Sequence, residues 1–244
     1  MKIYLIRHGK TMGNSQGRYI GITDEPLLDN ERVKLEQRSY PEAKAVFVSP
    51  LKRCRQTAAA IYPDHPVRIM EDMAECDFGS FENKNWKEMK DDPEYQAWID
   101  SDGTLPFPGG EDPMEFRKRC WRGFERAVAG CLREKIESAA FVVHGGTIMS
   151  ILEQYAVPQK GFYDWHVENG EGYRMEIISS LWTPSRSCLL YTSDAADESI
   201  YGNRVLPPRT ILPPKNRTCR LPKHSHSDDM HGMHTLFSPD MPLQ

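Results

Sequence analysis

The sequence predicts an α/β fold, a three-layer sandwich in which helices cover both faces of a mostly parallel central sheet. Three short apolar runs, residues 3–6, 45–48 and 139–143, are nearly continuous rather than alternating. Such runs are typical of strands that are buried on both faces of a parallel sheet. The last two runs lead into segments with helical patterning, which is the order of elements expected of this class.

The composition is that of a globular chain. Of 244 residues, 39% are apolar and 10% aromatic, enough for the core of one large domain or two small ones. The formal net charge of −4 gives no reason to expect a nucleic-acid partner. No apolar run approaches the roughly 20 residues of a membrane helix, and the N-terminus lacks the apolar region of a signal peptide. We therefore expect a cytoplasmic protein with no membrane partner.

The six cysteines are scattered without any C-x-x-C spacing. They are Cys54, Cys76, Cys120, Cys131, Cys188 and Cys219. This distribution predicts reduced side chains in the core or at the surface. Because structural zinc sites use closely spaced ligand pairs, we expect no metal and no other cofactor.

The first predicted strand ends abruptly in Arg7-His8-Gly9. Open α/β sheets bind ligands at the carboxyl ends of their strands, and a glycine there allows the backbone to turn sharply. A cation beside an imidazole indicates a bound anion and a nucleophile. The polar, glycine-containing stretch that follows, residues 14–28, is predicted to be a loop beside this end of the sheet.

The second strand, residues 45–48, leads into a predicted helix. Ser49 and Pro50 suit the N-cap and the first helical position, so we expect the helix to begin there. Arg53 then falls within the first turns, where the free N–H groups of a helix already favour an anion.

The segment between residues 67 and 112 is expected to carry a third strand, an acidic run and a cap. Residues 67–70 have strand patterning, and residues 84–112 are aromatic and polar without a sustained apolar period. Insertions of this kind change the substrate of a fold without changing its chemistry, so we expect a cap over the pocket. The alternative is that Trp86 and Trp98 merely pack a short helical excursion onto the core.

The second half of the chain repeats the pattern of strand followed by helix. Asp112 and Pro113 predict a helix start, and the apolar stripe that follows includes Phe116 and Phe124. The strand at residues 139–143 ends in His144-Gly145-Gly146 before another helix, and residues 174–178 are predicted to form a last strand.

These motifs resemble the signatures of the histidine phosphatase superfamily, also called phosphoglycerate-mutase-like. Three stretches carry the resemblance: Arg7-His8-Gly9, then Ser49-Pro50-Leu51-x-Arg53-x-x-Gln56-Thr57-Ala58, and finally His144-Gly145-Gly146. The second is far more specific than the first. The resemblance covers residues 1 to about 183, which we expect to form one histidine phosphatase domain with its cap at about 84–112.

The resemblance implies metal-independent hydrolysis of phosphomonoesters through a phosphohistidine. It gives His8 the role of nucleophile and His144 a second catalytic place. Glu75, which precedes the run Phe78-Gly79-Ser80-Phe81-Glu82, matches the family's proton donor. Its neighbours Asp77 and Glu82 are weaker candidates, because the resemblance marks the first acid of the run. The resemblance assigns phosphate binding to Arg7, Arg53, His144 and Asn14, and weaker substrate contacts to Arg18 and Thr23.

The substrate implied by the resemblance is a small phosphorylated metabolite. The stretch Trp165 to Tyr173 and the Phe-Gly-x-Phe-Glu run resemble α-ribazole phosphatases, which implies a place in cobalamin biosynthesis. His166 contacts substrate or sits on an edge strand, and the edge strand is the preferred interpretation. A phosphoglycerate mutase or a sugar-phosphate phosphatase of the same superfamily is the alternative, although mutases carry a longer insertion after the acid. A catalytically inactive phosphate-binding module is the alternative of another class. No oligomeric state is predicted.

The composition changes from Pro184 onward, where eight of the 18 prolines fall in 61 residues. Residues 188–198 resemble the forward translation of a transposon-end adapter used in preparing sequencing libraries. We predict that the natural reading frame was lost near Ser185 and that residues 184–244 form a non-native or disordered tail. No strand is expected there, so the family's last strand pairing would be missing. The four tail histidines, His224, His226, His231 and His234, lack the acid or cysteine spacing of a metal site.

Overall fold

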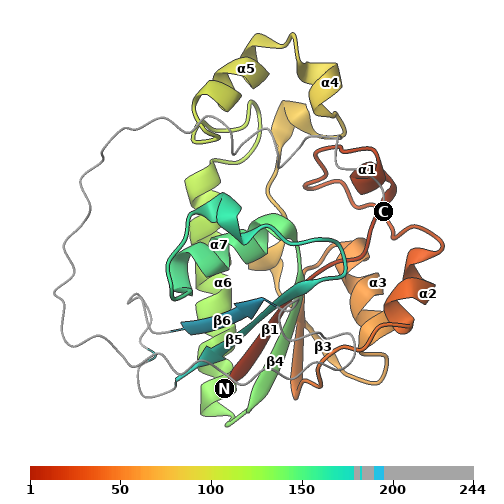
Figure 1. Ribbon diagram of the computed structural model, residues 1–244, viewed down its shortest axis with the longest axis vertical. Helices are drawn as coiled ribbons and strands as arrows, with labels where there is room; N and C mark the ends of the chain where they lie inside the picture. Colours follow the sequence, from red (N-terminus) through yellow and green to blue (C-terminus); the bar gives the residue numbers. More distant parts are fainter. Residues whose placement is uncertain (179–181, 183–189, 195–244) are drawn as a thin grey trace, which may run out of the picture.

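The computed structural model describes residues 1–178, 182 and 190–194 of the chain, and a six-stranded sheet forms its centre (Figure 1). The strand order is β3-β2-β4-β1-β5-β6. The first four strands of the chain run parallel: β1 (Lys2–Arg7), β2 (Ala45–Val48), β3 (Val67–Ile69) and β4 (Ser138–Val143). β5 (Gly172–Ile177) is antiparallel to β1, and β6 (Leu190–Asp194) is antiparallel to β5. The predicted α/β class with a mostly parallel sheet is confirmed.

Helices connect the strands and also extend beyond their carboxyl ends. The short turns of 3-10 helix are η1 (Glu71–Met73), η2 (Gly79–Phe81) and η3 (Phe162–Trp165). The α-helices are α1 (Met12–Ser15), α2 (Glu31–Glu36), α3 (Lys52–Ile61), α4 (Trp86–Met89), α5 (Pro93–Asp100), α6 (Pro113–Arg133) and α7 (Gly145–Tyr155).

In the described part of the chain, no helix is long and apolar enough to cross a membrane.

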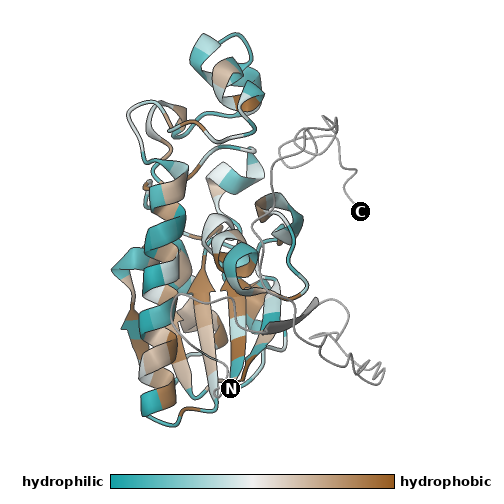
Figure 2. Ribbon diagram, turned by 90° about the vertical axis from the view of Figure 1, so that its left-hand side faces the viewer, coloured by the Kyte–Doolittle hydropathy of each residue, from teal (hydrophilic) through white to brown (hydrophobic). Residues whose placement is uncertain are grey.

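The side chains of β1 divide between two cores because successive residues of a strand point to opposite faces. Ile3 and Leu5 join the core beneath α6 and α7, whereas Tyr4 and Ile6 join the core beneath α3. Fully burying an aliphatic side chain of this size contributes about 1.5–3 kcal/mol. Apolar residues accordingly concentrate in the sheet between the helical layers (Figure 2). The three layers predicted from the sequence follow from this division.

The long helix α6 forms as its sequence predicts. Asp112 caps it, because its carboxylate accepts hydrogen bonds from the Met114 and Glu115 amides at 2.9 and 3.0 Å, and Pro113 occupies the first helical position. The stripe that includes Phe116 and Phe124 is buried. This helix therefore covers one face of the sheet.

The start of α3 differs from the prediction. The helix begins at Lys52 with Leu51 as its N-cap residue and no side-chain cap, so Ser49 and Pro50 lie before the helix. The Ser49 hydroxyl lies instead 2.7 Å from His144 Nε2. It also accepts from the Leu51 amide at 3.4 Å, a residue that still precedes the helix, so the Ser49 side chain does not cap α3. Arg53 still falls in the first turn.

The strand β6 corrects the expectation of an unpaired sheet edge after residue 184. It pairs antiparallel with β5 over five residues, with Tyr173 opposite Asp194 and Ile177 opposite Leu190. An exposed strand edge can pair with any extended segment, because main-chain hydrogen bonds do not require a particular side-chain pattern. The remaining residues of the predicted tail, 184–189 and 195–244 with its four histidines, lie outside the described residues.

The pairing of β1 with β5 predicts a sensitivity at Gly172. A Cβ at this position would overlap the Leu5 carbonyl oxygen of β1. We expect Gly172→Ala to lower the free energy of unfolding by about 1–3 kcal/mol, since an overpacked site forces the backbone to shift. Urea denaturation measures this change.

The matched control for this substitution is Gly130→Ala on α6, where an added Cβ would come no closer than 3.9 Å to another group. The control should leave the free energy of unfolding unchanged or raise it by up to about 1 kcal/mol, because alanine favours helix. Equal destabilisation by both substitutions would contradict the packing argument.

Candidate active site

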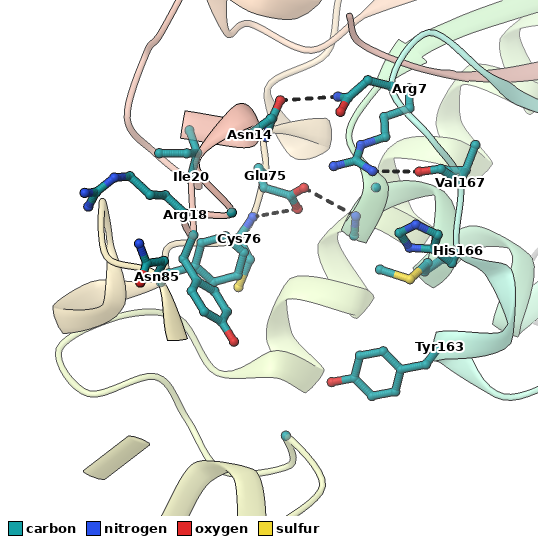
Figure 3. Close-up of a pocket in the computed structure, with 18 of the residues that line it drawn as sticks. Arg7, Asn14, Arg18, Ile20, Glu75, Cys76, Asn85, Tyr163, His166 and Val167 are labelled. Carbon is teal, nitrogen blue, oxygen red and sulfur yellow. Dashed lines mark hydrogen bonds between the residues drawn. The ribbon is translucent and has the colours of Figure 1, made fainter. Parts of the chain in front are cut away.

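A cavity of about 670 Å³ opens where the carboxyl ends of β1 and β4 meet the segments that follow them. Its polar end is lined by Arg7 and His8 after β1, by Asn14 of α1, by Glu75, and by the glycines at the start of α7. Figure 3 shows Arg7, Asn14 and Glu75 around this space. The structure thus brings together four of the side chains that the sequence singles out.

His8 is held as a neutral ring with one free nitrogen. Its Nδ1 lies 2.7 Å from the Gly9 carbonyl oxygen, and a carbonyl can only accept, so Nδ1 carries the proton. The lone pair is left on Nε2. The turn itself is fixed from α3, because the Gly9 amide donates to the Thr57 hydroxyl at 2.9 Å. Thr57 belongs to the second signature.

The environment of His8 opposes protonation. The side chain is only 4% exposed. Burial, and then the positive charges of Arg53 and Arg7, lower the pKa of His8 well below its ordinary value of 6.5. The ring is therefore uncharged at neutral pH, which is the form that a nitrogen nucleophile requires.

His144 stands against His8 at the end of the neighbouring strand. The two ring centroids are 5.2 Å apart at an interplanar angle of 65°. Arg53 Nε donates to His144 Nδ1 at 3.3 Å, so His144 carries its proton on Nε2 and donates it to the Ser49 hydroxyl. Burial and the Arg53 charge lower the pKa of His144 well below 6.5.

Arg53 is fully buried, and its guanidinium is occupied by main-chain carbonyls. Nη1 donates to Thr23 O at 2.7 Å, and Nη2 donates to Gly21 O at 2.8 Å and to Ile20 O at 3.3 Å. Neither Arg53 nor His144 lines the cavity. The resemblance implies direct phosphate contact for both, but in this structure they lie behind His8. Motif spacing cannot reveal that the 20–23 loop supplies these acceptors.

Arg7 has donors that the protein does not use. Its Nη1 donates to Val167 O at 2.6 Å, while its buried Nε has no hydrogen-bond partner among the described residues. A buried N–H without an acceptor is costly, and an anionic oxygen would satisfy it. Asn14 lies on the same cavity, where its Oδ1 accepts from the Thr11 amide and from Asn169 Nδ2, each at 3.2 Å.

Glu75 is a buried carboxyl group that lines the cavity. It accepts from the Cys76 amide at 3.1 Å and from the Gly146 amide at 3.3 Å. Burial raises the pKa of Glu75 above its ordinary value of 4.5, an effect that the Cys76 amide and Arg53 partly oppose. A carboxyl group with a raised pKa can donate a proton as well as accept one.

The two weaker sequence candidates have structural partners. Arg18 lines the rim of the cavity, but both of its terminal nitrogens bind Glu88 of α4 at 2.9 Å. Thr23 does not line the cavity, and its hydroxyl donates to Glu82 at 2.8 Å. These contacts join the loop after α1 to the segment that carries α4.

The far end of the cavity contains residues that sequence reasoning did not assign to the site. His166, for which the sequence favours an edge strand, lies before β5 and lines the cavity. Glu168 and Asn169 line it as well, and Asn169 reaches the polar end, where its Nδ2 donates to Asn14 Oδ1 at 3.2 Å. Its side chain and that of Tyr163 are visible in Figure 3. The Trp165 to Tyr173 motif was the available signal. An aromatic wall completes this end: Trp86, Trp98, Phe107, Phe116, Phe162 and Tyr163.

Trp86 and Trp98, the two tryptophans of the predicted cap, both line the cavity and both pack in or against an aromatic cluster. Trp98 is 3% exposed and belongs to an aromatic cluster with Tyr19 and Phe81, yet it also lines the cavity.

Among the described residues, no three histidine, cysteine or acidic side chains gather closely enough to hold a metal ion.

Comparison with known proteins identifies the family. The sequence pattern of the histidine phosphatase superfamily (branch 1) matches residues 3–188. The chain belongs to that superfamily. As a histidine phosphatase it is an enzyme, which confirms the resemblance inferred from its motifs.

Relatives of this histidine phosphatase differ in their named substrates. A metal-independent phosphoserine phosphatase of Arabidopsis thaliana is 31% identical over 160 residues, which are 62% of this chain and 66% of the relative. An adenosylcobalamin/alpha-ribazole phosphatase of Salmonella typhimurium is 27% identical over 208 residues, 75% of this chain and 100% of the relative. The crystal structure of the alpha-ribazole phosphatase of Shigella flexneri shares the fold, with a TM-score of 0.64 at 22% identity, and covers 77% of this chain and 96% of that one.

Proposed function

We propose that this histidine phosphatase hydrolyses small phosphomonoesters through a phosphohistidine on His8. The observation that carries the proposal is the state of the His8 ring. The ring is neutral, buried at the cavity, and carries its proton on Nδ1, which donates to Gly9 O. The unused Nε of Arg7 supports an anionic substrate group at the same end of the cavity. Positioning and electrostatics supply most of the catalysis of phosphoryl transfer.

In the first step, His8 Nε2 attacks phosphorus in line with the leaving oxygen. The N–P bond forms, the P–O bond breaks, and Glu75 gives its proton to the departing alkoxide. Arg7 and Asn14 hold the phosphoryl oxygens. Arg53 and His144 act from behind His8, where the Arg53 charge favours the negatively charged group and keeps the nucleophile neutral.

In the second step, the Glu75 carboxylate takes a proton from water. The water oxygen attacks phosphorus, the P–N bond breaks, and its electron pair returns to His8 Nε2. Inorganic phosphate leaves, and Glu75 is protonated again. One carboxyl group serves as acid and then as base, which requires a pKa above the usual range of a glutamate, as burial gives here.

We infer an alkyl phosphate whose leaving group carries an aromatic ring system, as in α-ribazole 5′-phosphate, and hence a role in cobalamin biosynthesis. The aromatic wall of the cavity supports this substrate, because flat rings stack on aromatic side chains. Part of that wall comes from residues 84–112, which we propose as the cap. A phosphoserine phosphatase is the second candidate, since the Arabidopsis relative has that name.

His8→Ala should reduce turnover at least about 10³-fold, because no phosphohistidine can form. The measurement is the steady-state hydrolysis of p-nitrophenyl phosphate by the full chain, with circular dichroism as the test of folding. His65→Ala removes an exposed histidine outside the cavity and is the matched control, expected to retain full activity. Near-normal hydrolysis by the His8 variant would refute the assignment.

Glu75→Gln should slow substrates selectively. An alkyl phosphate has a poor leaving group and needs the proton of Glu75, so its kcat should fall by about 10²-fold or more. p-Nitrophenyl phosphate releases a stable phenolate and should lose much less. Comparison of the two kcat ratios tests the role, and equal losses on both substrates would point to another acid.

The substrate proposal is tested by kcat/KM for α-ribazole 5′-phosphate, phosphoserine and 3-phosphoglycerate with the full chain. We expect α-ribazole 5′-phosphate to exceed the other two by about tenfold or more, since aromatic stacking contributes about 0.5–1.5 kcal/mol per contact. A preference for phosphoserine would favour the second candidate. Binding of phosphate without turnover of any ester would indicate a phosphate-binding module.

A further inference from the structure

Glu82 has contacts that none of the steps above explains. It follows η2 and does not line the cavity. Its Oε1 accepts hydrogen bonds from the Gly21 and Ile22 amides, each at 2.9 Å, and its Oε2 accepts from the Thr23 hydroxyl at 2.8 Å. One carboxylate therefore binds three consecutive residues of the loop formed by residues 20–23, which we name the Arg53 loop.

The carbonyls of the Arg53 loop bind a cation on the other side. Arg53 donates to the carbonyl oxygens of Ile20, Gly21 and Thr23. Gly21 is bonded through both of its main-chain groups, with its N–H toward Glu82 and its C=O toward Arg53. Charge-assisted hydrogen bonds of this kind are about twice as strong as neutral ones, and bonds in series polarise one another.

Close packing leaves the Arg53 loop little freedom to move. A Cβ at Gly21 would overlap the Cys76 carbonyl oxygen and the Glu82 carboxylate. Asn83 is bonded to the loop, because its Nδ2 donates to the Thr23 hydroxyl at 3.0 Å. Tyr19, just before the loop, accepts from the Asn83 amide at 2.9 Å and donates to Lys84 O at 3.0 Å. Contacts of neighbouring residues therefore hold both the segment before the predicted cap and the loop that binds Arg53.

We propose that Glu82 is a positioning residue of the active site, which fixes the Arg53 guanidinium against His144 and His8 through the Arg53 loop. Its effect on catalysis rests on the proposed function, whereas its effect on the two histidines does not. When Glu82 is lost, the loop amides lose their acceptor, the loop carbonyls shift, and Arg53 moves from its place beside His144 Nδ1.

This displacement is measurable because, of the charged groups, Arg53 has the largest effect on the pKa of both imidazoles. Burial and the Arg53 charge keep the pKa of His8 and of His144 below 6.5, so displacement of that charge should raise both values. Activity requires neutral His8 and falls as pH drops through its pKa. The acid limb of kcat/KM should therefore move to higher pH. The titratable or charged groups near the two rings are Arg7, Arg53, Glu75, Cys54 and Arg119.

The experiment compares three substitutions of Glu82 in the full chain. Glu82→Ala removes both carboxylate oxygens that accept from the loop. Glu82→Asp keeps the carboxylate charge, but its side chain is one methylene shorter, so the carboxylate lies farther from the loop. Glu82→Gln keeps an oxygen that can accept from the Gly21 and Ile22 amides. The readouts are the imidazole titrations of His8 and His144 by NMR, assigned with His→Ala variants, and the pH profile of kcat/KM for p-nitrophenyl phosphate.

We expect both imidazoles to titrate at higher pH in Glu82→Ala and Glu82→Asp, with a smaller shift in Glu82→Gln, whose neutral oxygen still accepts from the loop amides but more weakly. For the first two variants, kcat/KM below pH 6.5 should fall about tenfold more than it does above about pH 8. The control is Glu134→Gln, an exposed partner of Arg68 at 2.9 Å, which should change neither readout. If Glu82→Ala does not fold, Glu82→Asp carries the test.

The proposal is overturned if the imidazole titrations of Glu82→Ala or Glu82→Asp match those of the wild type. It is also overturned if activity falls by the same factor at every pH, since that result reports a loss of folded enzyme alone. Absence of any hydrolysis by the wild type would reject the proposed function instead. The NMR titrations would then still decide whether Glu82 positions Arg53.

Discussion

The active site depends on one buried cation. Removing a guanidinium from water costs several kcal/mol, and the three carbonyl oxygens of the Arg53 loop offset that cost. The Arg53 charge lies beside two buried imidazoles. Burial lowers the pKa of each ring most, and the Arg53 charge is the next largest cause. In the proposed mechanism, a neutral imidazole beside a positive charge suits a phosphate dianion, because the charge attracts the substrate without protonating the ring.

The parallel sheet explains why the two histidines meet. Arg7 is paired with Val143 in the register of β1 and β4, so His8 and His144 each follow the last paired residue of neighbouring strands. Parallel strands end at the same edge, and side chains just beyond that edge face one another. The rings of two histidines that are 136 residues apart in sequence thus lie with their centroids 5.2 Å apart.

The two ends of the cavity are built from different parts of the molecule. The polar end of the cavity is built from strand ends and from the start of α7, which the two cores hold rigidly. The aromatic end is built from η3, from α6 and from the segment that carries α4 and α5. Under the proposed mechanism, the leaving group would contact the aromatic end, and variation there would let relatives that share the phosphoryl-transfer site differ in their named substrates.

The sequence by itself determined the strands β1 to β5, the α6 stripe and the residues that end β1 and β4, because burial imposes local periodicities and strand ends carry polar motifs. It also identified the family through the second signature. Only the tertiary structure decided that Arg53 binds loop carbonyls, that Ser49 serves His144 rather than α3, that His166 reaches the cavity and that β6 pairs with β5. The physical reason is that these are hydrogen bonds and contacts between segments far apart in the chain, and no local pattern of side chains specifies which distant donor or acceptor will arrive.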